Sequence, residues 1–170
     1  VKSTTTLTTN RTSQRFGGPK VATLTAMVSL SDASVAAGTV EILDGTTVVA
    51  TLPLVNGKAT YTLPANTPAG VHHYTARYAD TNSIAGSSSA VVNVTVTKAS
   101  SLTVLWASKL HLHRGQVGPK LTAVVLLDSP AAATGTVTFF VDGVPVGTVN
   151  TVNGVATLQL GSNLSAGTHW

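Results

Sequence analysis

Residues 38–54 read GTVEILDGTTVVATLPL, and this stretch decides the fold. Val40 and Ile42 alternate with outward positions, as residues on the buried face of a strand do. Asp44-Gly45 ends that strand, and a second strand is predicted from Thr47 to Leu54. Asp-Gly is a strong hairpin signal because the favoured two-residue turn needs a positive φ at both central positions. The stretch therefore predicts a β-hairpin.

The same pattern returns later in the chain. The sequence from Ser3 to His73 recurs, shifted by 97 positions, from Ser100 to Trp170. A repeat of about a hundred residues is the size of a domain and too long for a solenoid unit. We therefore expect tandem domains: a complete one over residues 1–98, and a C-terminally incomplete one over residues 99–170.

Alternating residues and turn residues predict further strands around the hairpin. In the first copy they are Ser3–Thr9, Val21–Leu30, 58–63, His72–Ala79 and Ser88–Thr97. The segment Pro64–Gly70 is expected to be a crossover loop, since proline is excluded from the middle of a sheet. About seven strands in a copy predict an all-β fold of tandem antiparallel immunoglobulin-like sandwiches, the second lacking its last two strands.

The alternation also predicts which side chains form the two cores. In the first copy these are Leu24, Ala26, Val28, Val40, Ile42, Tyr61, Leu63, Ala76, Val92 and Val94. In the second they are Leu121, Ala123, Val125, Val137, Phe139, Leu158 and Leu160. Thr23 and Thr25 are expected on the opposite, solvent-facing side of their strand.

The composition agrees with an all-β protein and excludes several classes of function. Charged residues make up 9% of the chain, against roughly 25% in an ordinary soluble domain. Threonine accounts for 28 of the 170 residues, and its β-branched side chain fits a pleated surface. The absence of cysteine excludes disulfides, thiolate zinc sites and a cysteine nucleophile.

The charge and hydropathy patterns bear on partners. The net charge is +4, but the basic residues are scattered and form no stripe with aromatic residues, so nucleic-acid binding is not expected. No apolar run approaches the ~18 residues that a membrane span requires. Because the chain begins with Val1, we expect a processed or excised segment, and the absence of cysteine favours a bacterial source without indicating a compartment.

The acidic residues do not predict an active site. They are Asp32, Glu41, Asp44, Asp80, Asp128 and Asp142. Asp44 and Asp142 fall in the same hairpin turn of the two copies, which assigns them to turn chemistry. No nucleophile elbow, His-Glu-x-x-His helix or glycine-rich phosphate loop is present. We therefore predict that the chain is not an enzyme and needs no cofactor.

Two patterns could hold a metal ion. His111-x-His113 would place two imidazoles on one face of a strand, but two ligands are too few for zinc or copper. Asp80-Thr81-Asn82 could contribute to a calcium site, yet calcium takes six or more oxygen ligands. Ordinary solvated residues are the favoured interpretation of both patterns, and no metal site is predicted.

Histidine and tryptophan residues recur or change between the copies. His72 and His169 occupy equivalent positions after an Ala-Gly pair, which favours a structural hydrogen-bonding role. Trp106 and Trp170 replace Thr9 and His73 of the first copy. A tryptophan in a core or between domains is favoured, while an exposed one could stack on a sugar. Candidate ligand or partner contacts are therefore Trp106, His111, His113 and Trp170.

Several of these motifs carry a family resemblance. They are 18–28 (GPKVATLTAMV), 38–46 (GTVEILDGT), 56–60 (NGKAT), Ala69-Gly70-Val71-His72 and 74–78 (YTARY). The pattern resembles the bacterial immunoglobulin-like repeat, once complete and once partial. The resemblance implies tandem domains in a large secreted or cell-surface protein, acting as a spacer, stalk or adhesin segment, or as an accessory module beside an enzyme.

These observations leave three functions open. The favoured one is a non-enzymatic spacer or adhesin-stalk module whose partners are the neighbouring repeats of its own chain. The second is an accessory module that binds polysaccharide or a cell surface through loops or Trp106. The third is a subunit of an extracellular filament or virion that exchanges strands with a neighbouring chain. Since the second copy lacks its last two strands, we expect either that the parent chain continues or that a neighbour supplies a strand, and favour the former.

Overall fold

The hairpin predicted from residues 38–54 forms in the computed structural model of the chain, which describes residues 1–170. Its strands are β4 (Thr39–Asp44) and β5 (Thr47–Pro53), and a bulge follows Ile42. The turn differs from the prediction, because Asp44 still pairs with Thr47. Its central residues are therefore Gly45 and Thr46, and of these only Gly45 has a positive φ, 58°.

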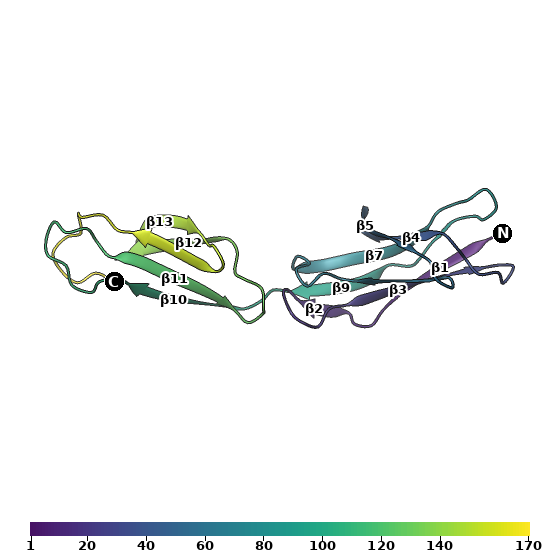
Figure 1. Cartoon of the computed structure of the whole chain (residues 1–170), viewed down its shortest axis with the longest axis horizontal. Coiled ribbons are helices and arrows are strands. Elements are labelled where there is room, and N and C mark those ends of the chain that lie inside the picture. The colour runs from purple at the N-terminus through teal and green to yellow at the C-terminus, as the bar shows by residue number, and fades with distance from the viewer. The chain divides into compact units, whose positions relative to one another are not determined.

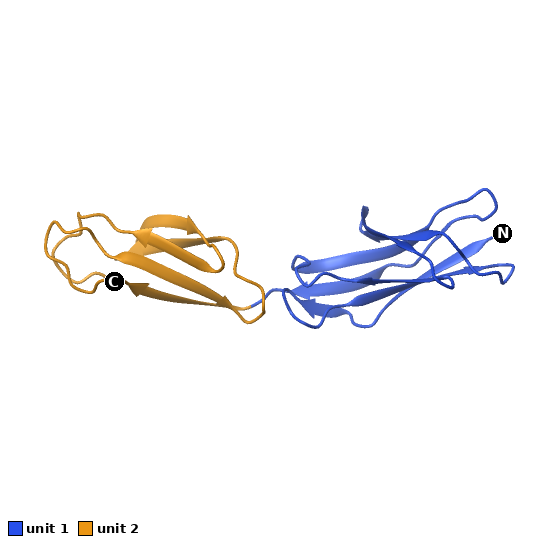
Figure 2. Ribbon diagram, viewed as in Figure 1, with its two compact units in different colours: residues 1–99 blue, residues 100–170 orange.

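The chain divides into two compact units, residues 1–99 and 100–170 (Figure 2). We call them unit 1 and unit 2. The chain contains no helix that is long and apolar enough to cross a membrane.

Unit 1 is a sandwich of two sheets (Figure 1). One sheet has the order β1 (Ser3–Thr9), β3 (Thr23–Leu30), β6 (Lys58–Thr62). The other has the order β2 (Ser13–Arg15), β9 (Val92–Thr97), β7 (Gly70–Tyr78), β4, β5, with β8 (Ser87–Ser88) on β7. All pairs are antiparallel except β2 with β9, which is parallel.

The core of unit 1 confirms the predicted register. Leu24 and Ala26 are fully buried, whereas Thr23 and Thr25 lie on the opposite, partly exposed face of β3. The other predicted core residues are buried as well, except for two that are half-buried and pack against the cluster. Those two are Tyr61 and Val92.

Two parts of unit 1 differ from the prediction. The short strand β2 was not predicted, because Ser13–Arg15 carries no apolar alternation. The strand predicted over Ser88–Thr97 is broken, and Ala90 is exposed. The reason lies in Ser89, whose hydroxyl donates to the Ala90 carbonyl at 2.8 Å and accepts from the Ala76 amide at 3.0 Å. A serine side chain that bonds the backbone in this way competes with the strand ladder.

Unit 2 repeats part of this arrangement. One sheet has the order β10 (Ser101–Ala107), β11 (Lys120–Leu127), β14 (Val155–Gln159), which matches β1-β3-β6. The strands β12 (Thr136–Val141) and β13 (Val144–Asn150) form a hairpin that matches β4-β5, with a bulge at the equivalent place. Asp142 and Gly143 are the two central residues of its turn, with φ of 53° and 78°.

The core of unit 2 is smaller than that of unit 1. Its buried members are Leu121, Ala123, Phe139, Ala156 and Leu160. Three further predicted core residues are only half-buried: Val125, Val137 and Leu158. The difference arises because β12 pairs with β13 alone, whereas β4 pairs with both β5 and β7.

The register of β10 corrects one predicted equivalence. Leu105 pairs with Ala123 as Leu7 pairs with Ala26, so this strand is shifted by 98 positions rather than 97. Trp106 therefore occupies the position of Thr8, not of Thr9. Since Thr8 lies on the outer face of its sheet, so does Trp106.

Candidate functional site: a duplicated aspartate–histidine contact and an exposed tryptophan

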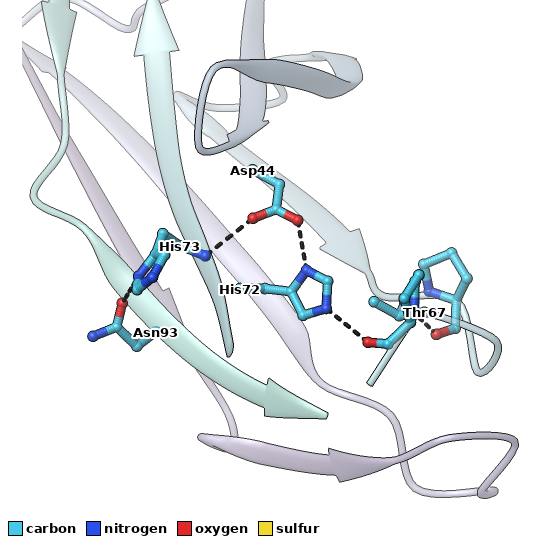
Figure 3. A network of polar contacts seen from close by, with 7 residues as sticks. Asp44, Thr67, His72, His73 and Asn93 are labelled. Atoms are coloured by element: carbon cyan, nitrogen blue, oxygen red, sulfur yellow. Dashed lines mark hydrogen bonds and ion pairs between the residues drawn. The ribbon is translucent and has the colours of Figure 1, made fainter. Parts of the chain in front are cut away.

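The polar cluster of unit 1 forms where β4 ends beside β7. Asp44 is the last residue of β4, and His72 lies in β7. The His72 Nδ1 is 2.6 Å from the Asp44 Oδ2, and its Nε2 is 2.8 Å from the Pro68 carbonyl oxygen (Figure 3). The other oxygen of Asp44 accepts a hydrogen bond from the His73 amide at 3.0 Å. One histidine thus connects the β4-β5 hairpin to the loop before β7.

Unit 2 contains the same set of contacts. The His169 Nδ1 is 2.6 Å from the Asp142 Oδ2, and its Nε2 is 2.9 Å from the Ser165 carbonyl oxygen. The Trp170 amide donates to the Asp142 Oδ1 at 2.9 Å, as the His73 amide does to Asp44. The prediction that His72 and His169 have a structural hydrogen-bonding role is confirmed.

Both histidines face acceptors on both ring nitrogens, a carboxylate and a carbonyl oxygen. An imidazole can donate from both nitrogens only when it is protonated. Burial opposes the charged form of His72, but the hydrogen bonds to Asp44 and Pro68 and the charge of Asp44 outweigh it and raise its pKa above 6.5. For His169, the hydrogen bonds to Asp142 and then Ser165 raise the pKa above 6.5. The hydrogen bond from His169 and then the one from the Trp170 amide lower the Asp142 pKa below 3.8.

The environment of His72 is more enclosed than that of His169. The side chain of His72 is 13% exposed and that of His169 is 24% exposed. Tyr74 stacks on His72, with ring centroids 5.9 Å apart and an interplanar angle of 15°. Burial, and then the charges of Asp44 and Tyr61, raise the pKa of the Tyr74 phenol, which stays neutral. We therefore expect the contact in unit 1 to contribute more to stability.

The loop held by His72 is fastened by two further side chains. Thr67 is buried, and its hydroxyl donates to the Pro64 carbonyl at 2.6 Å. Gln14, which is 4% exposed, donates to the same carbonyl at 3.0 Å and accepts from the Ala22 amide at 2.8 Å. A side chain from β2 thus joins the loop to the start of β3.

An Asp–His pair invites comparison with a hydrolase triad, but the geometry lacks a nucleophile. In a triad the histidine nitrogen remote from the carboxylate accepts a proton from a serine hydroxyl. In unit 1 that nitrogen faces the Pro68 carbonyl, which has no proton to give. In unit 2 the Ser165 Oγ is 3.5 Å from the His169 Nε2, but the Ser165 carbonyl oxygen is closer, at 2.9 Å. The Nε2 therefore donates to that carbonyl and cannot serve as a base towards the hydroxyl.

The two histidines that were weighed as metal ligands, His111 and His113, do not lie on a strand. Residues 108–119 contain no strand, so the prediction that His111 and His113 lie on one strand face is wrong. A turn forms there instead, in which the Gln116 amide donates to the His113 carbonyl at 3.1 Å. No group of three or more histidine, cysteine, aspartate or glutamate side chains is placed to hold a metal ion.

The two predicted tryptophan contacts are exposed. Trp106 is 49% exposed on β10, and Trp170 is 82% exposed. Neither belongs to a hydrophobic core, so the part of the prediction that placed them in a core is wrong. Trp170 and His111 both line a cavity of about 590 Å³ in unit 2, together with His113 and Phe140.

Sequence reasoning missed the pairing of Asp44 with His72. It assigned the aspartates to turns and the histidines to hydrogen bonds without connecting them. The signal was present in the repeat, because Asp142 and His169 recur together with nearly the same separation. Two side chains of complementary charge that recur jointly are better explained by a contact than by two independent roles.

Comparisons with known proteins agree with this fold. The profile of the bacterial Ig-like domain (group 3) matches residues 7–97, more than half of the chain. No curated protein sequence matches. The structure of the adhesin InvE from Yersinia pseudotuberculosis is similar, with a TM-score of 0.51, 17% identity, and 93% of this chain covered. The chain spans 51% of that structure.

Two other solved structures have lower TM-scores. The fibronectin(III)-like modules of Clostridium thermocellum CbhA give 0.42 at 19% identity, covering 92% of this chain and 78% of that one. The D0-D1 domain of intimin gives 0.41 at 24% identity, covering 95% and 86%. The fold, the core register and the match over residues 7–97 lead to one conclusion: the chain belongs to the bacterial Ig-like domain family, group 3.

Proposed function

We propose that the chain is a non-enzymatic spacer or stalk segment of a bacterial secreted or cell-surface protein. The similarity in fold to a module of an adhesin supports this role. The Asp–His contacts support it too, because both are used to fasten loops and neither addresses a substrate. We further propose that residues 99–170 are a second copy of the same domain, since β10, β11 and β14 pair as β1, β3 and β6 do.

The observation that carries the spacer proposal is the parallel pairing of β2 with β9. A spacer transmits force between its two ends, and in unit 1 these ends lie at opposite ends of the sandwich (Figure 1). The Phe16 amide donates to the Thr97 carbonyl and the Thr95 amide to the Thr12 carbonyl, each at 2.9 Å. Force along the strands loads these hydrogen bonds together, in shear, so they must break at once rather than one after another.

Single-molecule force spectroscopy on the full chain tests the proposal. We expect unit 1 to unfold in one step at a resolved force and to release roughly 3.5 Å of chain per residue. Phe16→Pro removes the amide that bonds Thr97, and it should lower the unfolding force. Phe16→Ala removes the same ring but keeps the amide. Equal forces for the two variants, or no resolved unfolding event in the unaltered chain, would contradict a force-bearing role.

A binding function is the second candidate, and the exposure of Trp106 favours it. At 49% exposure on a sheet face, its indole is available to a ligand. Binding to polysaccharide or to a cell-surface component, with a dissociation constant below about 100 μM and lost in Trp106→Ala, would support it. The third candidate is strand exchange with a neighbouring chain. It is supported by the pairing of β12 with β13 alone, because a strand added at the other edge of β12 would extend that sheet.

A further inference from the structure

The outer face of the sheet β10-β11-β14 is apolar, whereas the same face of β1-β3-β6 carries mostly hydroxyl groups. In unit 2 the apolar outward-facing residues are Leu102, Val104, Trp106, Val124, Leu126 and Val155. The residues at the same register positions in unit 1 are Thr4, Thr6, Thr8, Met27, Ser29 and Lys58. We call the six residues of unit 2 the apolar outer face.

The strand register makes this face continuous. Leu102 pairs with Leu126 in one row, and Val124 pairs with both Val104 and Val155 in the next. Paired residues on one face have Cβ atoms about 5 Å apart, so these side chains are in contact. Leu102 is 62% exposed and Leu126 is 52% exposed. Single exposed apolar residues are ordinary, but a continuous patch marks an interaction surface.

The chemistry of the face selects the kind of partner. Leucine and valine side chains offer no hydrogen bonds, so the hydroxyl groups of a sugar laid across these rows would lose water without replacement. The only charged residue on this side of the sheet is Lys120, which borders the patch beyond Thr122. A nucleic acid or another polyanion therefore finds too little positive charge here. A second flat apolar surface fits best.

The size of the face limits the strength of the contact. The face spans three strands, which lie about 4.8 Å apart. Along each strand it extends over about six residues, because its three rows of outward residues recur every second position, and each residue adds about 3.3 Å. The projected area is therefore about 280 Å². A stable complex buries about 800 Å² of accessible surface on each partner. We propose that the apolar outer face packs against the same face of a second copy of this chain, in a weak side-by-side contact. Such a contact goes beyond the spacer role, since it would join neighbouring spacers laterally.

Sedimentation equilibrium of the full chain over a range of concentrations tests this proposal. We expect the weight-average mass to rise with concentration from 17.2 kDa towards twice that value. The triple variant L102T/V104T/W106T gives β10 the outward residues of β1 and should keep the mass at that of one chain. The reverse variant T4L/T6V/T8W, in unit 1, should increase self-association. Amide exchange in β11 and β14 for the unit 2 variant, and in β3 and β6 for the unit 1 variant, confirms that each is folded.

A second pair of variants separates this face from the inner side of unit 2. Leu105 and Phe140 line the cavity of unit 2 and are 57% and 53% exposed, so they could also cause association. The proposal expects L105T/F140T to leave the concentration dependence unchanged. Association that survives the outer-face variant, or that is lost only in the inner one, overturns it. Binding of a glycan or a neutral lipid vesicle by the outer face, with no self-association, overturns it as well.

Discussion

His72 and Asp44 form the closest polar contact between β7 and the end of β4, with 2.6 Å between Nδ1 and Oδ2. Through its other nitrogen His72 holds the Pro68 carbonyl, so one imidazole connects two strands and a loop. The equivalent contact of unit 2 has the same length. Because it recurs in both units, it is a fastening built into the domain rather than a feature of one ligand site.

Asp44→Asn should destabilise unit 1. The substitution removes the negative charge that pairs with the imidazolium, while the amide oxygen can still accept one hydrogen bond. Hydrogen bonds to charged groups contribute about 1.5–3 kcal/mol, and since the Asp44 side chain is 27% exposed we expect about 1–2 kcal/mol. Urea unfolding, read by amide exchange in β4 and β7, measures the change. The matched control is Asp32→Asn, an exposed aspartate whose bonds stay within its own loop, and an equal loss there would contradict the prediction.

The same contact should make the stability of unit 1 depend on pH. Folding raises the pKa of His72 above its ordinary 6.5, so protonation favours the folded state. The stabilisation is fully present below pH 6.5 and is lost as the pH rises through the folded value. The urea midpoint of unit 1 should therefore fall as the pH is raised past 6.5. His72→Gln should flatten this dependence, and a midpoint that rises with pH would show that the sign is wrong.

Unit 2 should lose stability on both sides of a window. The pKa of His169 is raised above 6.5, so its contribution is lost at higher pH, as in unit 1. The pKa of Asp142 is lowered below 3.8, so its contribution is present above that value and is lost as the pH falls through the folded pKa. Exchange protection of β12 should be greatest between pH 3.8 and 6.5. His169→Gln should remove the decline at high pH, and protection that keeps rising above pH 6.5 is the opposing result.

The parts of this fold that follow from side-chain alternation were predictable. Leu24 and Ala26 are buried and Thr23 and Thr25 are not, because one face of β3 meets the core and the period of a strand is two residues. β2 could not be found in this way. Its three residues are held by parallel pairing with β9 and by the amide group of Gln14, which are long-range contacts that leave no local pattern.

The candidate sites depended on details that alternation does not carry. A uniform shift of 97 positions equates Trp106 with Thr9, whereas the strand pairing equates it with Thr8. The difference arises because the first strand of unit 2 is shifted by one residue relative to the strands that follow. His111 and His113 were placed on a strand because their spacing suits one, although residues 108–119 form none. Asp44 and Asp142 reach equivalent histidines from different turn positions, because Asp44 is the last paired residue of β4 whereas Asp142 is the first central residue of its turn.

Gln14→Leu should destabilise unit 1 although the substitution is apolar and similar in size. It leaves the Ala22 amide without the Gln14 oxygen, in a position where Ala22 is fully buried. An unsatisfied buried donor costs about 1–3 kcal/mol, and we expect a loss in that range. The Pro64 carbonyl still accepts from Thr67, so the loop keeps one of its two side-chain bonds. Gln116→Leu, at an exposed glutamine of unit 2, is the matched control and should change the urea midpoint little.

Gly57→Ala should be more damaging than Gly45→Ala, although both glycines have a positive φ. Gly45 has φ of 58° with no atom within 4 Å of an added Cβ, so only the left-handed backbone costs energy, about 1 kcal/mol. Gly57 has φ of 72°, and its Cβ would lie 2.8 Å from the Val28 carbonyl oxygen. That oxygen belongs to β3, and the Val28 amide donates to the Gly57 carbonyl at 2.8 Å, so relief of the clash disturbs this bond. We expect a loss of about 2–4 kcal/mol, measured by urea unfolding of unit 1. Equal losses in the two variants would mean that the turn conformation alone, and not its close approach to β3, requires glycine at position 57.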